Sequence, residues 1–254
     1  MFGNAQAAFL TQKERLRITQ NARTAINFIT DDIRMAGYGV PVSGNQISTW
    51  IDWVPGLTGR VTFVEGVGSN PDVLYVVAAF DESPATLIFD ENEGETLLSL
   101  TSGSATYFSY APRTIVCIGG TELARVTSVD AQSDSIGIST HPSNNGVGLN
   151  RDFKSGTPVE IVKVIKYTCS STGSGFFLGR PYLAREEITT ASQPFNFIHI
   201  LTMGIEDLQV QMLPEGTHVS ITSRAKKTDS RYVNPDHDDH YRRTTYSSRA
   251  YSRN

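Results

Sequence analysis

The first part of the chain has the hydrophobic spacing of one long amphipathic helix. Its apolar residues recur at spacings of four, four, three and four: Ile18, Ala22, Ile26, Ile29 and Ile33. No proline precedes Pro41, and Gly37 and Gly39 supply a stop signal. The pattern predicts a helix over residues 5–36, roughly 45 Å long at about 1.5 Å per residue. Its first turns are apolar on all sides, so we expect part of its surface to contact another chain.

After Gly39 the sequence is typical of strands and turns. Short segments rich in Val, Ile, Thr and aromatic residues are bounded by Gly, Pro, Asn and Asp. The predicted strands are 60–64, 72–79, 86–89, 106–110, 114–118, 123–129, 135–139, 158–167, 175–179, 208–213, 218–223 and 244–251. A second, short helix is predicted over 195–203, and an exposed loop over 140–157.

Strands without alternating helices disfavour a parallel α/β enzyme fold and favour antiparallel sheets. We therefore predict an α+β fold class, in which one long N-terminal amphipathic helix packs on the antiparallel β-sheets of a β-rich globular head. The predicted division is residues 1–39 for the helix and residues 40–254 for the head.

The composition is that of a globular protein, with 39% hydrophobic and 19% charged residues. No apolar run approaches the roughly 20 residues of a membrane-spanning helix, and the first ten residues do not have the pattern of a signal peptide. The net charge of −4 conceals an asymmetry, because residues 224–254 hold eight Lys+Arg against four Asp+Glu. This asymmetry indicates either charge complementarity within or between subunits, or simply a solvated last strand.

No pattern of catalytic residues emerges. The chain has no G-x-S-x-G nucleophile elbow, and its five histidines lie in different predicted elements, apart from the last two. The glycine-rich residues 173–179 have the wrong spacing for a phosphate-binding loop and predict a hairpin turn. We therefore expect no enzymatic activity and no cofactor.

The polar segment 234–240 begins like a calcium-binding loop. The similarity then fails, because Asp239 stands where a glycine is needed and Thr245 where a glutamate is needed. The weak metal candidates in this segment are Asp236, Asp238 and His240, with calcium as a possible ion. Asp and Asn are also ordinary turn residues, so a loop without a metal is the favoured interpretation.

Arginines and tyrosines alternate near the end of the chain. Arg242, Arg243, Arg249 and Arg253 could contact nucleic acid, with the tyrosines stacking on bases. The same alternation is ordinary for a half-exposed strand, and we therefore do not expect a nucleic-acid partner.

Cys117 and Cys169 each lie beside an apolar strand pattern. They are either a disulfide or two buried thiols. A disulfide would close a loop of about 50 residues and stabilise the fold by roughly 4 kcal/mol in the chain-entropy model.

Four segments together resemble PilW-type minor pilins of type IV pili. Residues 28–39, FITDDIRMAGYG, resemble the family's D-I-R-x-A-G-Y/F segment at the end of the helix. Residues 72–76 (DVLYV) resemble its first central strand, and residues 204–211 (GIEDLQVQ) its later I-E-D-L-Q-V-Q segment. Residues 241–254 resemble its R-R-x-x-x-T-T-V-x-x-R-N terminus. The resemblance spans nearly the whole chain.

The family's peptidase site, methylated N-terminus and apolar anchor have no match here. The chain therefore looks like the globular part of such a subunit, cut within the helix, which would reach a membrane only through the missing anchor. The resemblance implies a structural subunit at or near the pilus tip that primes assembly with other minor pilins and the major pilin. It implies a bacterial cell-envelope location, first at the inner membrane and periplasm and then in the extracellular pilus, where a Cys117–Cys169 disulfide is favoured.

Two alternatives stay open: a J-type pseudopilin of type II secretion, and a tip module that binds a ligand, a surface or DNA. In the preferred hypothesis, a minor pilin, subunits assemble by helix packing and head–head contacts. The helix residues expected to contact partners are Phe9, Leu10, Arg15, Leu16, Ile18 and Ile26.

Overall fold

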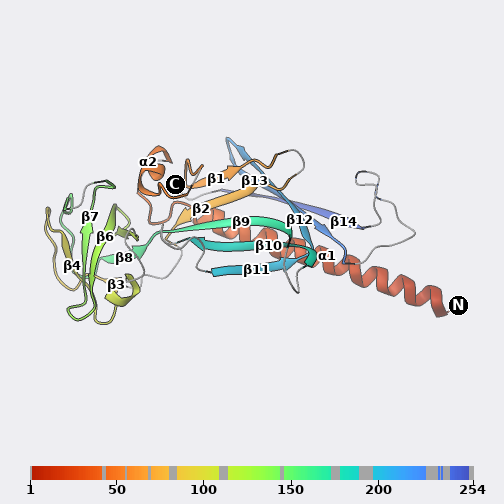
Figure 1. The fold of residues 1–254 in the computed structure, drawn as a ribbon, viewed down its shortest axis with the longest axis horizontal. Helices are drawn as coiled ribbons and strands as arrows, with labels where there is room; N and C mark the ends of the chain where they lie inside the picture. Colours follow the sequence, from red (N-terminus) through yellow and green to blue (C-terminus); the bar gives the residue numbers. More distant parts are fainter. Residues whose placement is uncertain are drawn as a thin grey trace.

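Helix α1 (Phe2–Met35) runs from one end of an elongated molecule into its middle, and the strands gather around its second half and beyond it (Figure 1). The computed structural model describes residues 2–41, 44–54, 56–67, 70–79, 85–108, 114–143, 146–172, 178–188, 197–226, 234, 236 and 241–251. No helix in these ranges is long and apolar enough to cross a membrane.

Two antiparallel sheets flank the second half of α1. The first has five strands in the order β1-β2-β9-β10-β11: β1 (Val61–Val64), β2 (Val73–Ala78), β9 (Lys163–Thr172), β10 (Leu178–Ile188) and β11 (Phe197–Met203). The second has three strands in the order β12-β13-β14: β12 (Ile205–Leu213), β13 (Gly216–Arg224) and β14 (Arg243–Ala250). Strand β13 alternates regularly between buried and half-buried side chains, as expected for a sheet with one face against a core.

The largest core belongs to the helix and both of these sheets together. Ile29 and Ile33 of α1 are fully buried against Leu74 of β2, Leu183 of β10 and Ile221 of β13. The apolar stripe of the helix therefore lies against strands that are distant in sequence, and the burial of these large side chains holds α1 in place.

A third sheet forms a separate lobe at the end of the molecule far from the N-terminus (Figure 1). Its strands, in spatial order, are β3 (Ala85–Thr86), β8 (Pro158–Ile161), β5 (Ile115–Ile118), β6 (Glu122–Asp130), β7 (Ser135–Ser139) and β4 (Leu97–Ser99). The two edges of this sheet meet at a bridge between Leu87 and Leu100, so the sheet curls around its own core. A 3₁₀ turn, η1 (Ala105–Phe108), covers part of that core.

The lobe is inserted into a hairpin of the five-stranded sheet. Strands β2 and β9 pair directly, with Ala78 opposite Lys163, and the whole lobe lies between them in sequence. A third apolar cluster joins lobe and body, in which Trp50 of the short helix α2 (Gly44–Trp50) packs with Ile115 and Cys117 of β5.

The predicted fold class, an α+β pilin-like fold with a long helix on the sheets of one head, is wrong. The protein is mostly β: strands make up 46% of the described chain, in three sheets with a half-barrel among them. Apart from α1, the described helices are only the seven residues of α2 and the single turn η1. The class was inferred from one strong helical stripe, and a local pattern does not reveal how distant strands divide among separate sheets.

Some individual elements also differ from the predictions. The long N-terminal helix is confirmed, but the short helix predicted over 195–203 is strand β11. The strand predicted over 106–110 overlaps η1, and helix α2 was not predicted. Short apolar runs fit a strand and a buried helix equally well, which explains the errors.

Candidate functional site

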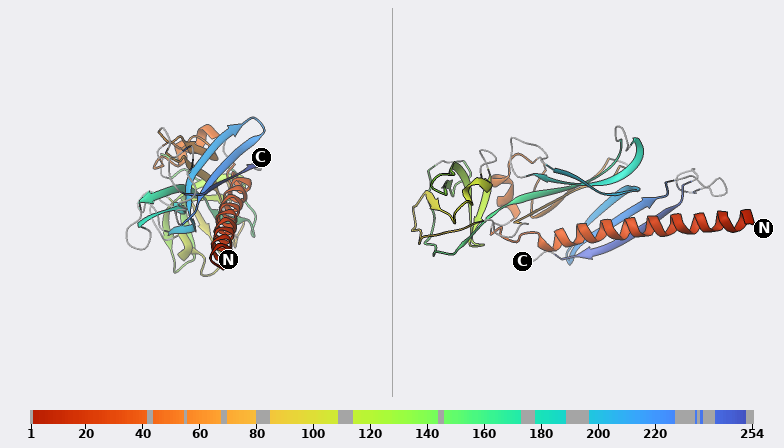
Figure 2. Two further views of the ribbon diagram at one scale, coloured as in Figure 1. Left: turned by 90° about the vertical axis from the view of Figure 1, so that its right-hand side faces the viewer. Right: turned by 90° about the horizontal axis from the view of Figure 1, so that it is seen from below.

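The N-terminal half of α1 extends past the sheets into solvent (Figures 1 and 2). Phe9 and Leu16 are 64% and 63% exposed, and a spacing of seven residues places them on nearly the same side of the helix. Ile18 follows Phe9 by nine residues, about two and a half turns, so it lies on the opposite side, and it is only 2% exposed. The helix therefore has two apolar faces, one covered by its own sheets and one open.

Polar contacts hold α1 at the point where it leaves the sheets. The side-chain amide of Asn21 donates a hydrogen bond to the carbonyl oxygen of Met203 over 2.6 Å. Two turns before Asn21, the Glu14 carboxylate accepts a hydrogen bond from the backbone N–H of Lys226 over 2.5 Å. It accepts another from Nη2 of Arg17, on the same helix, over 2.7 Å. These contacts connect the helix to the ends of β11 and β13 and so set the direction of its projecting half.

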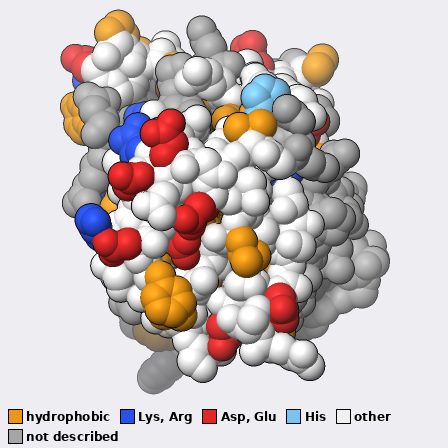
Figure 3. Space-filling model, turned by 90° about the vertical axis from the view of Figure 1, so that its left-hand side faces the viewer, with side chains coloured by type: hydrophobic (Ala, Val, Ile, Leu, Met, Phe, Trp, Pro, Cys, Tyr) orange, Lys and Arg blue, Asp and Glu red, His pale blue; other side chains and the backbone are white. Residues whose placement is uncertain are grey.

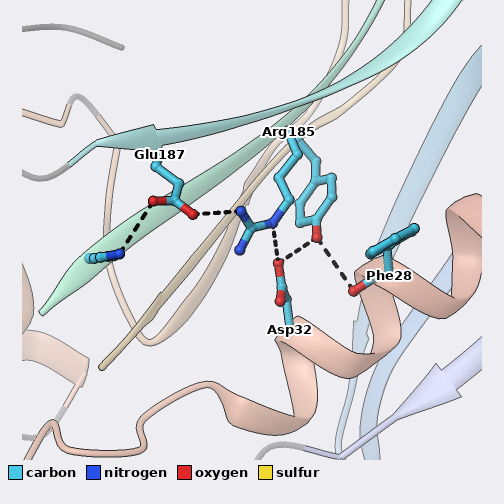
Figure 4. Close-up of polar contacts among 6 residues, drawn as sticks. Phe28, Asp32, Arg185 and Glu187 are labelled. Atoms are coloured by element: carbon cyan, nitrogen blue, oxygen red, sulfur yellow. Dashed lines mark hydrogen bonds and ion pairs between the residues drawn. The ribbon is translucent and has the colours of Figure 1, made fainter. Parts of the chain in front are cut away.

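A partly buried ionic cluster secures the other end of α1 (Figure 4). Asp32 Oδ2 accepts hydrogen bonds from Arg185 Nε of β10 over 2.8 Å and from the hydroxyl of Tyr167 of β9 over 2.5 Å. Arg185 Nη1 also donates to Glu187 over 2.8 Å, and the Tyr167 hydroxyl lies 3.4 Å from the carbonyl oxygen of Phe28. We call Asp32, Tyr167, Arg185 and Glu187 the helix latch.

The electrostatics of the helix latch favour one protonation state. Burial raises the pKa of Tyr167, and the neighbouring Asp32 carboxylate raises it further. The phenol therefore remains a hydrogen-bond donor to Asp32 at physiological pH. The Asp32 and Arg185 side chains are each 16% exposed, and a pair buried to this degree fixes a geometry more surely than it adds net stability.

The segments that resemble PilW-type subunits meet around this part of the molecule. Asp32 belongs to the first of them and forms the helix latch. Asp72, in the second, accepts a hydrogen bond over 2.7 Å from the backbone N–H of Val210, in the third. Glu206, also in the third, is bonded to Arg243, in the last. In this structure the four segments therefore make contacts that hold the helix and its two sheets together.

Two of the predicted partner residues are placed differently. Phe9, Leu10, Arg15 and Leu16 are exposed as expected. Ile18 and Ile26 are 2% and 6% exposed and are buried within this chain, so their assignment to a partner interface is wrong. They belong to the regular apolar stripe, which packs on the chain's own sheets, whereas the open face consists of apolar residues off that stripe.

The predicted disulfide is absent, and both cysteines are free thiols. Cys117 on β5 lies in the apolar cluster that joins lobe and body, whereas Cys169 on β9 packs against the core around α1. Burial raises the pKa of Cys117 to about 12 and also raises that of Cys169. The prediction failed because the two strands belong to different sheets, and the thiols are protonated and poorly reactive.

Only Asn234 and Asp236 of the predicted metal-binding loop 234–240 lie within the described residues. Asp236 is exposed in a turn in which its backbone N–H donates to Asn234 Oδ1 over 2.9 Å. Asp238 and His240 lie outside the described residues. Within the described ranges, no group of His, Cys, Asp and Glu side chains could hold a metal ion.

Two of the arginines near the end of the chain are paired within the molecule. Arg243 is bonded to Glu206, and Arg249 Nη1 to Glu215 over 2.8 Å. Arg253 lies outside the described residues. Two of the charges that were weighed for nucleic-acid contact are thus already paired with carboxylates.

The lobe farthest from the N-terminus has an acidic outer face (Figure 3). Residues 85–161 carry nine Asp+Glu against four Lys+Arg, a net charge of −5. Phe89, Leu97 and Tyr107 of this lobe are each more than half exposed. The acidic lobe and the projecting helix are therefore at opposite ends of the molecule (Figure 1).

Sequence reasoning missed the partners of Asp32. Arg185 lies 153 residues further along the chain, and no local pattern links the two. The only available signal was two adjacent carboxylates, Asp31 and Asp32, at a boundary where one of them had to face the core.

Comparisons with models of protein families, with curated proteins and with solved structures give no match. The resemblance to PilW-type subunits therefore depends on the four segments described above.

Proposed function

We propose that this chain is a non-enzymatic assembly subunit that binds neighbouring subunits through the projecting half of α1. The specific role we propose is a minor pilin of a type IV pilus, acting at or near the tip to prime assembly with other minor pilins and the major pilin. The observation that carries the proposal is the open apolar face of α1 with Phe9 and Leu16, opposite the face that packs on the sheets.

The open face has the character of a helix that packs between other elements. A helix that is apolar on more than one side is normally buried on each of them. Covering Phe9 and Leu16 with a partner would contribute roughly 1.5–3 kcal/mol for each side chain, before the cost of association. The expected partner is another apolar helix, because anchors spaced by seven residues fit an adjacent helix or groove.

Rigid attachment of α1 also supports the proposal. The helix latch holds its end and the Glu14 and Asn21 contacts hold its middle, so the projecting half has a fixed direction. A subunit with a fixed helix can align its neighbours along one axis.

The choice of a type IV pilus depends on the four segments that resemble PilW-type subunits, not on the fold class. A J-type pseudopilin would present the same open helix face but would bind pseudopilins. The identity of the partners therefore separates the two.

The test is to mix this chain with the soluble domains of the minor pilins encoded beside it, and to measure complexes by size-exclusion chromatography with light scattering. We expect a stoichiometric complex that is lost in the double variant Phe9→Ser/Leu16→Ser. Leu97→Ser is the matched control, because Leu97 is 56% exposed but lies on the lobe at the other end. A complex that survives the helix substitutions, or a monomer that ignores every partner, would overturn the proposal.

A further inference from the structure

A small pocket lies at the root of the projecting helix, between α1 and the ends of the two sheets beside it. Its volume is about 80 Å³. Its polar lining comes from Arg17, Arg224, Lys226 and Tyr241, and Pro181 and Met203 contribute apolar surface. This volume holds several water molecules and therefore one small oxyanion, but not a nucleotide.

The described residues that line the pocket carry positive charge. Arg17 is paired with Glu14 over 2.7 Å, while Arg224 lies 3.5 Å from Glu206, which it shares with Arg243. Among the described residues that line the pocket, Arg17, Arg224 and Lys226 are cationic and none is acidic. Such an excess in a partly enclosed space raises the local concentration of anions.

The donors at the pocket are oriented by other contacts. The guanidinium group of Arg224 stacks on the ring of Tyr241, 4.4 Å from its centroid, which holds its plane in place. The Nε of Arg17 is buried and makes no hydrogen bond within the part of the chain that the structure describes. The Arg17 side chain as a whole is 42% exposed and lines the pocket, so its guanidinium group has further N–H donors to offer an oxyanion there.

The Glu14 side chain shows that this cationic surface binds a carboxylate. Its carboxylate bonds to Arg17 Nη2 and to the backbone N–H of Lys226, so a carboxylate of the chain itself occupies part of the cationic surface. We propose that the pocket formed by Arg17, Arg224, Lys226 and Tyr241 is a binding site for a small oxyanion, either a phosphate or a carboxylate. Because Arg17 comes from α1 and the other three from the C-terminal part of the chain, the bound anion would tie the root of the helix to the sheet.

The test is a titration of the full chain with inorganic phosphate and, separately, with acetate, at ionic strength held constant with sodium chloride. Binding is followed by ¹H–¹⁵N correlation spectra. We expect saturable shifts confined to amides near Gly204, Arg224 and Lys226. Saturation by phosphate alone identifies a phosphate site, and saturation by both anions identifies a general oxyanion site.

Variants separate specific binding from a general salt effect. Arg17→Gln/Lys226→Gln should weaken binding by about tenfold or more, because two charge-assisted interactions are lost. Glu14→Gln should strengthen it, because the competing internal carboxylate becomes neutral. Arg249→Gln is the control: it also removes a positive charge from the C-terminal sheet, but Arg249 pairs with Glu215 and is not part of the pocket.

Several results would overturn the proposal. Chemical shifts that grow with anion concentration without saturating, and equally in all variants, would show that no site exists. Unchanged anion affinity in the double variant Arg17→Gln/Lys226→Gln would also show that the pocket is not the binding site. If the double variant does not fold, the single variant Lys226→Gln replaces it in the test, because Lys226 is exposed and its substitution leaves the core intact. Unchanged anion affinity in that variant would then overturn the proposal.

Discussion

Two adjacent aspartates show how strongly the role of a residue depends on its position. Asp32 is part of the helix latch, whereas Asp31 is exposed and pairs with Arg34, one turn away. We expect Asp32→Asn to lower the free energy of unfolding by about 1.5–3 kcal/mol, because the charge-assisted bonds to Arg185 and Tyr167 are weakened while Arg185 keeps Glu187 as an ionic partner. Asp31→Asn should leave it almost unchanged, because exposed ion pairs contribute little. Urea denaturation of both variants provides the measurement, and equal effects would contradict the buried role of Asp32.

Glu91 in the lobe should make the stability of the protein depend on pH. It is 5% exposed and accepts a hydrogen bond from the backbone N–H of Ser99 over 3.0 Å. Burial, together with a hydrogen bond to Glu95, raises the pKa of Glu91 from 4.5 to about 7. The folded state therefore keeps a proton that the unfolded state loses, and this group makes stability fall as the pH rises from about 4.5 to about 7.

Glu91→Gln should remove that component, because the amide cannot lose a proton and its oxygen can still accept the hydrogen bond from Ser99. The lowered pKa of Glu95 does not interfere, since its effect appears only as the pH falls below 4.5. The measurement is denaturant unfolding of both proteins across this range. Parallel pH profiles for the two would show that Glu91 does not titrate as expected.

Among the elements, α1 has two apolar faces with different roles, and single substitutions should separate them. Ile29 is fully buried in the core with both sheets, so Ile29→Ala should cost about 2–5 kcal/mol of folding free energy. Leu16→Ala removes an exposed side chain and should change stability by less than about 0.5 kcal/mol. Thermal and urea unfolding of the isolated chain give both values. A large loss for Leu16→Ala would mean that this residue packs within the chain.

The same helix shows what the sequence could and could not predict. The spacing of Ile18, Ala22 and Ile26 was enough to predict α1, because a helical period is a local property. That spacing could not show whether its stripe packs on the chain's own sheets or on a partner, and Ile18 and Ile26 were assigned wrongly for this reason. The apolar residues off the stripe, Phe9 and Leu16, are the ones that stay exposed and form the proposed partner face.

At the scale of the whole molecule, the sequence also could not show that the chain after α1 forms two bodies. The lobe has its own core, but Ile115, Cys117 and Leu123 lie in the cluster with Trp50 that joins it to the rest. The pairings that define the lobe, such as β3 with β8, connect strands separated by more than 70 residues. The result is a charge-separated molecule, with an acidic lobe at one end and a helix that carries the candidate partner face and the cationic pocket at the other (Figures 1 and 3).

The insertion of the lobe into the β2–β9 hairpin makes it removable in principle. Because Ala78 and Lys163 are paired neighbours, a turn of about four residues can replace residues 80–161 and still close the hairpin. We expect the remaining chain to keep α1 packed on its two sheets, since the core around the helix contains no residue of the lobe. Circular dichroism and urea unfolding would show whether that body folds cooperatively.

The deletion should also expose the tryptophans. Trp50 and Trp53 are the only tryptophans of the chain, and both lie at the cluster that Ile115, Cys117 and Leu123 of the lobe complete. Without the lobe, Trp50 loses part of its apolar cover, so the fluorescence emission should shift to longer wavelength while the helix signal persists. Trp53→Phe in the same background assigns the shift to Trp50. Unchanged emission would mean that the lobe does not cover this cluster, and loss of the helix signal would mean that the lobe is needed to hold α1.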